Sequence, residues 1–151
     1  MHSSVWQSFL PQLYFFAQII LSIFLGAVIG WHREKRGKAA GARTYALVTA
    51  GAALFTILSA NIFPDDPARI AAQIVTGIGF LGAGAILHKE SAIVGLTTAA
   101  GLWITAAIGM AVGSRYYLLA ILTTATILAV LMINERRLAH AGAERDEVEE
   151  E

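Results

Sequence analysis

The chain alternates between long apolar blocks and short charged segments. No Asp, Glu, Lys or Arg occurs in residues 1–32, 44–64, 70–88, 91–114 or 116–134. A bilayer core of about 30 Å takes about 20 helical residues. The blocks therefore predict five transmembrane helices, at about 12–31, 44–63, 70–87, 91–114 and 116–134. Because polarity does not alternate with period two, as strands would require, the predicted fold is all-α: a polytopic membrane protein with five transmembrane helices packed through small-residue seams.

The composition supports the same conclusion. Hydrophobic residues make up 56% of the chain and charged residues 15%, against about a quarter charged in a soluble domain. The predicted helices lack the polar, solvent-facing side that helices of a soluble fold need. The 11 basic and 11 acidic residues cancel, so no net charge attracts nucleic acid. These features exclude a soluble enzyme, a nucleic-acid-binding protein and a disordered protein, and the absence of cysteine excludes thiolate metal sites.

Basic residues indicate how the helices are oriented in the membrane. One side would carry nine Lys and Arg, in the 32–43 loop, the 88–90 turn and the C-terminal tail, and the other would carry Arg69 and Arg115. The N-terminus is therefore expected outside and the C-terminus in the cytoplasm. Residues 1–134 form the predicted membrane domain. Residues 135–151 are expected to form a charged, disordered cytoplasmic tail, because this segment is rich in acidic residues.

Small residues follow one face of four predicted helices. Membrane helices associate where small side chains let their backbones approach, so these faces predict close packing. The seams are Ser22, Gly26 and Gly30 in the first span, Ala46, Ala50 and Ala53 in the second, Ala72, Thr76, Gly79 and Ala83 in the third, and Gly95, Ala99, Ala106, Gly109 and Gly113 in the fourth. We expect four tightly packed helices with the fifth at the periphery, and Trp103 packed inside the bundle.

The third span contains a glycine-dense segment with Gly77, Gly79, Gly82 and Gly84. Its G-x-G-x-x-G spelling does not predict a nucleotide site, because the glycines lie in the middle of an apolar span and outside a βαβ unit. Close helix packing is the favoured interpretation. Unwinding into a broken, cavity-lining helix is the alternative, since each glycine weakens a helix by about 1 kcal/mol.

An acidic pair precedes the third span. Asp65 and Asp66 are followed by Pro67, which favours a helix start with a carboxylate at the N-cap and proline at the first helical position. The alternative is an outer Mg²⁺ site, because Mg²⁺ often takes one or two carboxylates. Arg69, close by in the sequence, makes this a poor dedicated site.

Glu34 is the single acid of the first loop, among several basic residues. A screened surface ion pair is the simpler interpretation, and a carboxylate that faces a partner or senses a cation is the functional one. Arg43 precedes the second span, where it either snorkels to the membrane interface or pairs with Glu34.

The polar residues inside the third and fourth spans are uncharged, and they include Gln73, Thr76, Thr97, Thr98 and Thr105. Such groups usually bond to a backbone carbonyl or to a neighbouring helix. The absence of charge within the spans counts against a coupled transporter. The sequence also offers no nucleophile paired with a base and no pair of metal-binding histidines. We predict a protein that is not an enzyme and has no cofactor, with Mg²⁺ as its one candidate ion.

Several motifs occur together between Gly30 and Gly113: Arg33-Glu34, Gly41-Ala42-Arg43-Thr44, the run from Asp66 to Gly84, and Gly95-Leu96-Thr97-Thr98 with Trp103. With these motifs the chain resembles the MgtC/SapB family of bacterial inner-membrane proteins. The resemblance implies five spans, an outside N-terminus and a role in adaptation to low magnesium. Many members are labelled magnesium transporters, and others act as virulence factors that restrain the membrane ATP synthase. Longer members add a cytoplasmic ACT-like domain, which this sequence is expected to lack.

Two functions compete at this point, beside a third, a scaffold that only responds to membrane stress. The first is a binding protein that docks against another membrane protein, or a second copy of itself, and adjusts activity during magnesium limitation. Uncharged spans and glycine seams favour it. The second is a magnesium transporter or channel, favoured by the glycine-dense third span and the outer acidic pair.

Overall fold

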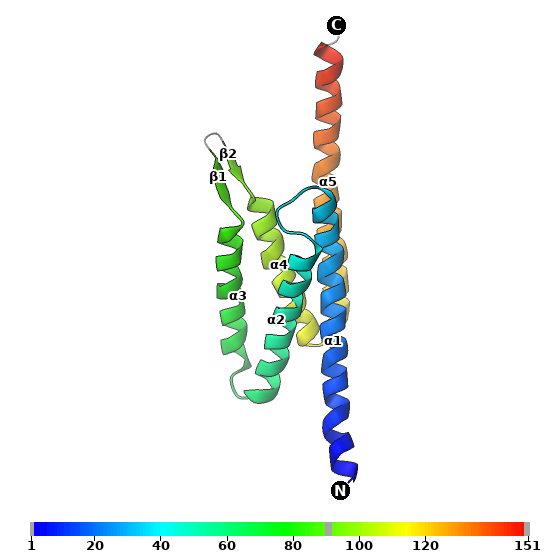
Figure 1. The fold of residues 1–151 in the computed structure, drawn as a ribbon, viewed down its shortest axis with the longest axis vertical. Coiled ribbons are helices and arrows are strands. Elements are labelled where there is room, and N and C mark those ends of the chain that lie inside the picture. The colour runs from blue at the N-terminus through cyan, green and yellow to red at the C-terminus, as the bar shows by residue number, and fades with distance from the viewer. Residues whose placement is uncertain (1, 90–91, 150–151) are drawn as a thin grey trace.

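The chain folds into five helices and one short hairpin in its described part. The structure is a computed structural model that describes the backbone of residues 2–89 and 92–149, and the side chains of residues 9–86 and 93–133. The elements in chain order are α1 His2–Lys35, α2 Ala42–Ile62, α3 Pro67–Gly84, β1 Leu87–Lys89, β2 Ala92–Val94, α4 Leu96–Gly113 and α5 Tyr117–Glu149 (Figure 1).

The helices α1, α2 and α4 form the centre of the bundle. Each of the three packs against the other two, whereas α3 packs on α2 and α4, and α5 packs on α4 and α1. Figure 1 shows α3 on one side of this centre, α5 on the other, and the two chain termini at opposite ends. The fifth helix is therefore peripheral, as predicted, but the third helix is peripheral as well.

Several of the helices have the length and polarity of membrane spans. Within the described residues, three helices are long and apolar enough to cross a bilayer: α1 from Phe9 to Lys35, α2 and α4. Residues Tyr117–Ile133 of α5 form a shorter apolar helix. The all-α, polytopic membrane fold is thus confirmed. Crossing by α3 and α5 remains a prediction, supported by the opposite ends at which the termini lie (Figure 1).

The fourth span begins later than the sequence pattern predicted. The expected helix at 91–114 starts only at Leu96, and residues 92–94 instead pair antiparallel with residues 87–89. Gly95, which connects β2 to α4, has a φ of +100°, a left-handed conformation that residues with a side chain disfavour. A Cβ at this position would also overlap the carbonyl oxygen of Ala85. The apolar character of residues 91–95 concealed this turn.

The fifth helix continues beyond its apolar part. The structure gives helix to Glu149, where the sequence analysis expected a disordered tail over 135–151. Ala, Glu, Arg and Leu dominate residues 135–149, and all four have high helix propensity. A charged composition alone therefore does not distinguish a tail from a helical extension.

The predicted seams of the first, second and fourth spans are used inside the bundle. A Cβ on Gly30 would lie 2.6 Å from the Ala42 Cα, and one on Gly113 would lie 2.7 Å from the Ala53 carbonyl oxygen. Gly109 is equally close to α2, because a Cβ there would overlap the carbonyl oxygen of Thr49. These contacts bring the backbones of α1 and α4 directly against α2.

Two packing predictions are wrong. The third helix is not tightly packed, because Ile78 and Gly82 are its buried residues. Trp103 is 49% exposed on the surface of α4 instead of lying inside the bundle. The face of α4 toward α2 is made of small residues that allow close approach, so this large ring turns outward, where lipid would surround it.

Candidate functional site

The outward face of α3 carries the small residues that the bundle leaves uncovered. Its predicted seam, Ala72, Thr76, Gly79 and Ala83, is exposed along the whole helix. A Cβ built on Gly79 would meet no described atom within 4 Å, whereas one on Gly82, which faces α4, would lie 3.7 Å from the Ala99 Cβ. Phe80, beside the seam, is 83% exposed. We call Ala72, Thr76, Gly79 and Ala83 the α3 face.

The glycine-dense segment is not unwound. Helix α3 is continuous from Pro67 to Gly84, so the broken-helix alternative is wrong. The close-packing interpretation holds for Gly82 alone, because a Cβ on Gly77, Gly79 or Gly84 would meet nothing among the described residues. Three of the four glycines therefore lie on a helix surface without bulky side chains, and no described residue packs closely against them.

An apolar groove runs between α3 and α2, next to the α3 face. Its volume is about 460 Å³. Both walls contain a glycine, Gly51 from α2 and Gly77 from α3, and Gln73 is the one polar residue that lines it. Gln73 is exposed, so it lies where a partner could reach it. The groove can therefore bind apolar side chains, and its lining does not provide a set of oxygen ligands for an ion.

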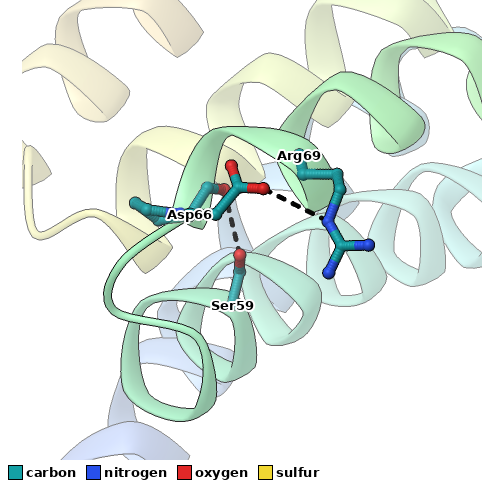
Figure 2. Close-up of polar contacts among 4 residues, drawn as sticks. Ser59, Asp66 and Arg69 are labelled. Carbon is teal, nitrogen blue, oxygen red and sulfur yellow. Dashed lines mark hydrogen bonds and ion pairs between the residues drawn. The ribbon is translucent and has the colours of Figure 1, made fainter.

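The acidic pair Asp65 and Asp66 precedes the start of α3, as predicted. Asp66 is the N-cap residue and Pro67 follows at the first helical position. The Asp66 carboxylate makes no capping bond; its Oδ2 lies 3.3 Å from Arg69 Nε (Figure 2). The Ser59 hydroxyl donates to the Pro67 carbonyl at 2.9 Å and ties the turn to α2. The described residues contain no group of three His, Asp or Glu that could hold a metal, so a Mg²⁺ site at Asp65 and Asp66 stays a prediction.

Glu34 has a structural partner. Its Oε2 accepts a hydrogen bond of 2.9 Å from the Ala42 backbone amide, at the first turn of α2. A carboxylate here satisfies a helix donor and interacts favourably with the helix dipole. Arg43 is exposed. The structure thus gives Glu34 a capping role that neither sequence interpretation included, and the cation-sensing role stays a prediction.

Thr97 and Thr98 begin α4 and differ in their surroundings. Thr97 is exposed, whereas Thr98 is buried and accepts a hydrogen bond of 3.0 Å from Arg33 Nη2. Arg33 is 4% exposed, although the sequence analysis counted it as a loop charge. The signal was present: Arg33 continues the buried face of α1 from Ser22, Gly26 and Ile29 with helical spacing.

The chain matches a known protein family over most of its length. The model of the MgtC family matches residues 19–139. The chain belongs to the MgtC family.

The similarity extends to named relatives of this MgtC-family chain. YhiD of Escherichia coli strain K12, for which magnesium transport is a suggested role, is 48% identical over 128 residues, covering 79% of this chain and 60% of YhiD. MgtC of Salmonella typhimurium strain LT2 is 43% identical over 135 residues, covering 84% of this chain and 58% of MgtC. The chain therefore spans about three fifths of the length of these relatives. No solved structure matches it.

A polar cluster connects α1, α4 and α5 of this MgtC-family chain, and the sequence analysis did not predict it. Gln18 of α1 is buried, and its Nε2 donates to the Val112 carbonyl and to the Tyr117 hydroxyl, both at 2.9 Å. The Tyr117 hydroxyl also bonds to that of Tyr14. This cluster ties α5 to α1 and α4. A glutamine well inside the first predicted span was the available signal.

Proposed function

We propose that this MgtC-family chain is a non-enzymatic membrane protein that binds and adjusts another membrane protein during adaptation to low magnesium. The observation that carries the proposal is the exposed α3 face. Lipid tails are as apolar as leucine, so membrane helices gain little by hiding leucines and associate through close backbone contact at small residues. The α3 face offers such a surface, and the described chain leaves it uncovered.

The polar groups of α3 support packing better than conduction. The Thr76 hydroxyl donates to the Ala72 carbonyl of its own helix at 3.1 Å, so its methyl group remains for contact with a neighbour. The groove beside the α3 face is apolar except for Gln73. A helix from a partner could lie along Gly79 and Ala83 and place an apolar side chain in this groove, with Gln73 as its hydrogen-bond partner.

The resemblance to MgtC/SapB proteins suggests which partner to test. Members of that family that act as virulence factors are implied to restrain the membrane ATP synthase, and the relatives include proteins named MgtC. We extend to this chain both the bacterial inner membrane and the orientation with the N-terminus outside. In Figure 1 the loop after α1, the hairpin and the C-terminal end of α5 lie at the same end of the molecule, so the expected basic residues would face the cytoplasm together.

A magnesium transporter is the competing function. It is favoured by the role suggested for YhiD, at 48% identity. The described residues give it little support, because Asp66 is paired with Arg69 and the groove along α3 lacks carboxylates. We therefore favour the binding protein.

Site-specific photocrosslinking tests the proposal. A photoreactive residue is placed at Thr76 on the α3 face and, as a matched control, at the lipid-exposed Leu122 on α5. Cells are grown at low magnesium, and crosslinked products are identified by mass spectrometry. A discrete product with another membrane protein from position 76 and not from position 122 is expected. Equal products from both positions, or none from position 76 at normal protein level, would refute the proposal. A product with a second copy would assign the α3 face to self-association.

A further inference from the structure

A buried positive charge lies at the junction of α1 and α4. Arg33 is 4% exposed, and a guanidinium stays charged under all ordinary conditions. Nη2 donates to the Thr98 hydroxyl at 3.0 Å, but Nε is enclosed and has no hydrogen-bond partner. The adjacent acid, Glu34, is directed to the α2 amide. Among the described residues no carboxylate pairs with Arg33, and a buried, unpaired charge is strongly unfavourable.

The start of α4 adds a second positive feature at the same place. Its N-cap is Gly95, which has no side chain to accept a hydrogen bond, and the first intrahelical bond runs from the Ala99 amide to the Gly95 carbonyl. The amides of Leu96, Thr97 and Thr98 therefore lack intrahelical acceptors. An 18-residue helix also presents its positive dipole end here. A cation at this end is opposed by the helix unless an anion lies between them.

A third helix completes the surroundings. Tyr45 of α2 is fully buried, with its hydroxyl 3.5 Å from the Thr98 carbonyl oxygen. A Cβ on Gly101 would overlap this hydroxyl, so the glycine is what admits the ring. The Tyr45 hydroxyl donates its proton to the Thr98 carbonyl. The donors left at this point are therefore the Arg33 guanidinium of α1 and the first amides of α4, next to the exposed Leu96 and Thr97.

We propose that Arg33 and the first turn of α4, with the buried Tyr45 ring packed beside them, form a binding site for a phosphate-type oxyanion. A planar guanidinium and free helix amides are the donors that suit phosphate oxygens. The site lies at headgroup depth: Trp31 is 57% exposed, and Lys35 Nζ lies 3.8 Å from the centre of its ring, an arrangement typical of the membrane boundary. The phosphate is that of an anionic phospholipid or of free phosphate in solution. This site is separate from the α3 face and stands without the proposed function.

The test measures thermal unfolding of the purified full chain by tryptophan fluorescence. One arm titrates inorganic phosphate with the protein in a neutral detergent. The other compares bilayer discs of phosphatidylcholine with discs that also contain phosphatidylglycerol. A saturable rise in the unfolding midpoint in the first arm identifies free phosphate, and a rise confined to the second arm identifies the lipid.

Two variants decide whether the effect belongs to this site. Arg33→Gln should weaken the stabilisation about tenfold or more in concentration, because it removes a charge-assisted donor. Arg43→Gln, which removes an exposed charge at the same end, should respond like the wild type. If Arg33→Gln does not fold, Arg33→Lys keeps the charge without the planar fork, and should bind more weakly than Arg43→Lys. No saturable effect in either arm of the wild type, or equal losses at positions 33 and 43, would overturn the proposal.

Discussion

Gly109 and Gly79 lie on two glycine-containing helices of 18 residues each, and the structure predicts opposite effects when they are replaced. Gly109 faces α2, where a Cβ would overlap the Thr49 carbonyl oxygen and lie 3.0 Å from the Ala52 Cβ. Gly79 faces outward, and a Cβ there would meet nothing described within 4 Å. Gly109→Ala should therefore force α4 away from α2, whereas Gly79→Ala should leave the bundle intact.

The size of the effect follows from two opposing contributions. Overpacking a well-packed contact costs about 1–3 kcal/mol, and the upper end applies because the obstacle is backbone, which cannot rotate aside. Replacing glycine with alanine in a helix stabilises the helix by about 1 kcal/mol. Gly109→Ala should thus lower the free energy of unfolding by about 2 kcal/mol, or about 30-fold in the unfolding equilibrium constant. Gly79→Ala should raise that free energy by at most about 1 kcal/mol.

Reversible unfolding in mixed micelles with increasing sodium dodecyl sulfate, followed by tryptophan fluorescence, measures both variants against the wild type. The leucine variants extend the comparison. Gly109→Leu should fail to assemble, and Gly79→Leu should assemble normally and lose its partner. A Gly109→Ala variant as stable as the wild type, or equal destabilisation at position 79, would refute this assignment of the two faces.

Three further predictions follow from single contacts. Glu34→Gln should lower the free energy of unfolding by about 1 kcal/mol, because a charged acceptor for the Ala42 amide becomes a weaker neutral one; the same micelle titration measures it, and no change would contradict the capping role. Gly95→Ala should destabilise the fold by more than about 1 kcal/mol, since its φ is +100° and a Cβ meets Ala85; unchanged thermal unfolding would contradict the turn. Asp66→Asn should leave magnesium uptake into reconstituted vesicles unchanged, and reduced uptake at equal protein level would favour a transporter.

The helices could be predicted because one simple rule produces them. Lipid excludes charge, so each charge-free block predicts a membrane helix, and small residues on one face predict where two backbones meet. The rule does not say which small face finds a partner within the same chain. Gly109 and Gly79 carry the same signal, yet α4 packs against both α1 and α2 while α3 lies outside this centre.

The missed features depend on contacts between distant residues. Arg33 looks like a loop charge because it stands in a basic segment. Its helical spacing from Ile29 indicates the buried face of α1, but the hydrogen bond to Thr98 depends on the packing of α1 against α4. Gln18 likewise gains its meaning from Tyr117, about a hundred residues away in the chain. The turn at Gly95 was hidden because the residues around it are as apolar as the helix that follows.

The most direct test of the account is proton pumping in inverted inner-membrane vesicles that contain this chain, energised separately by ATP and by respiration. We predict that the wild type lowers the ATP-driven signal alone, and that Gly79→Leu, at equal protein level, restores it while Arg43→Gln does not. A loss of both signals would indicate an ion leak and favour a channel. An unchanged ATP-driven signal, or full activity of the Gly79→Leu variant, would contradict regulation of the ATP synthase through the α3 face.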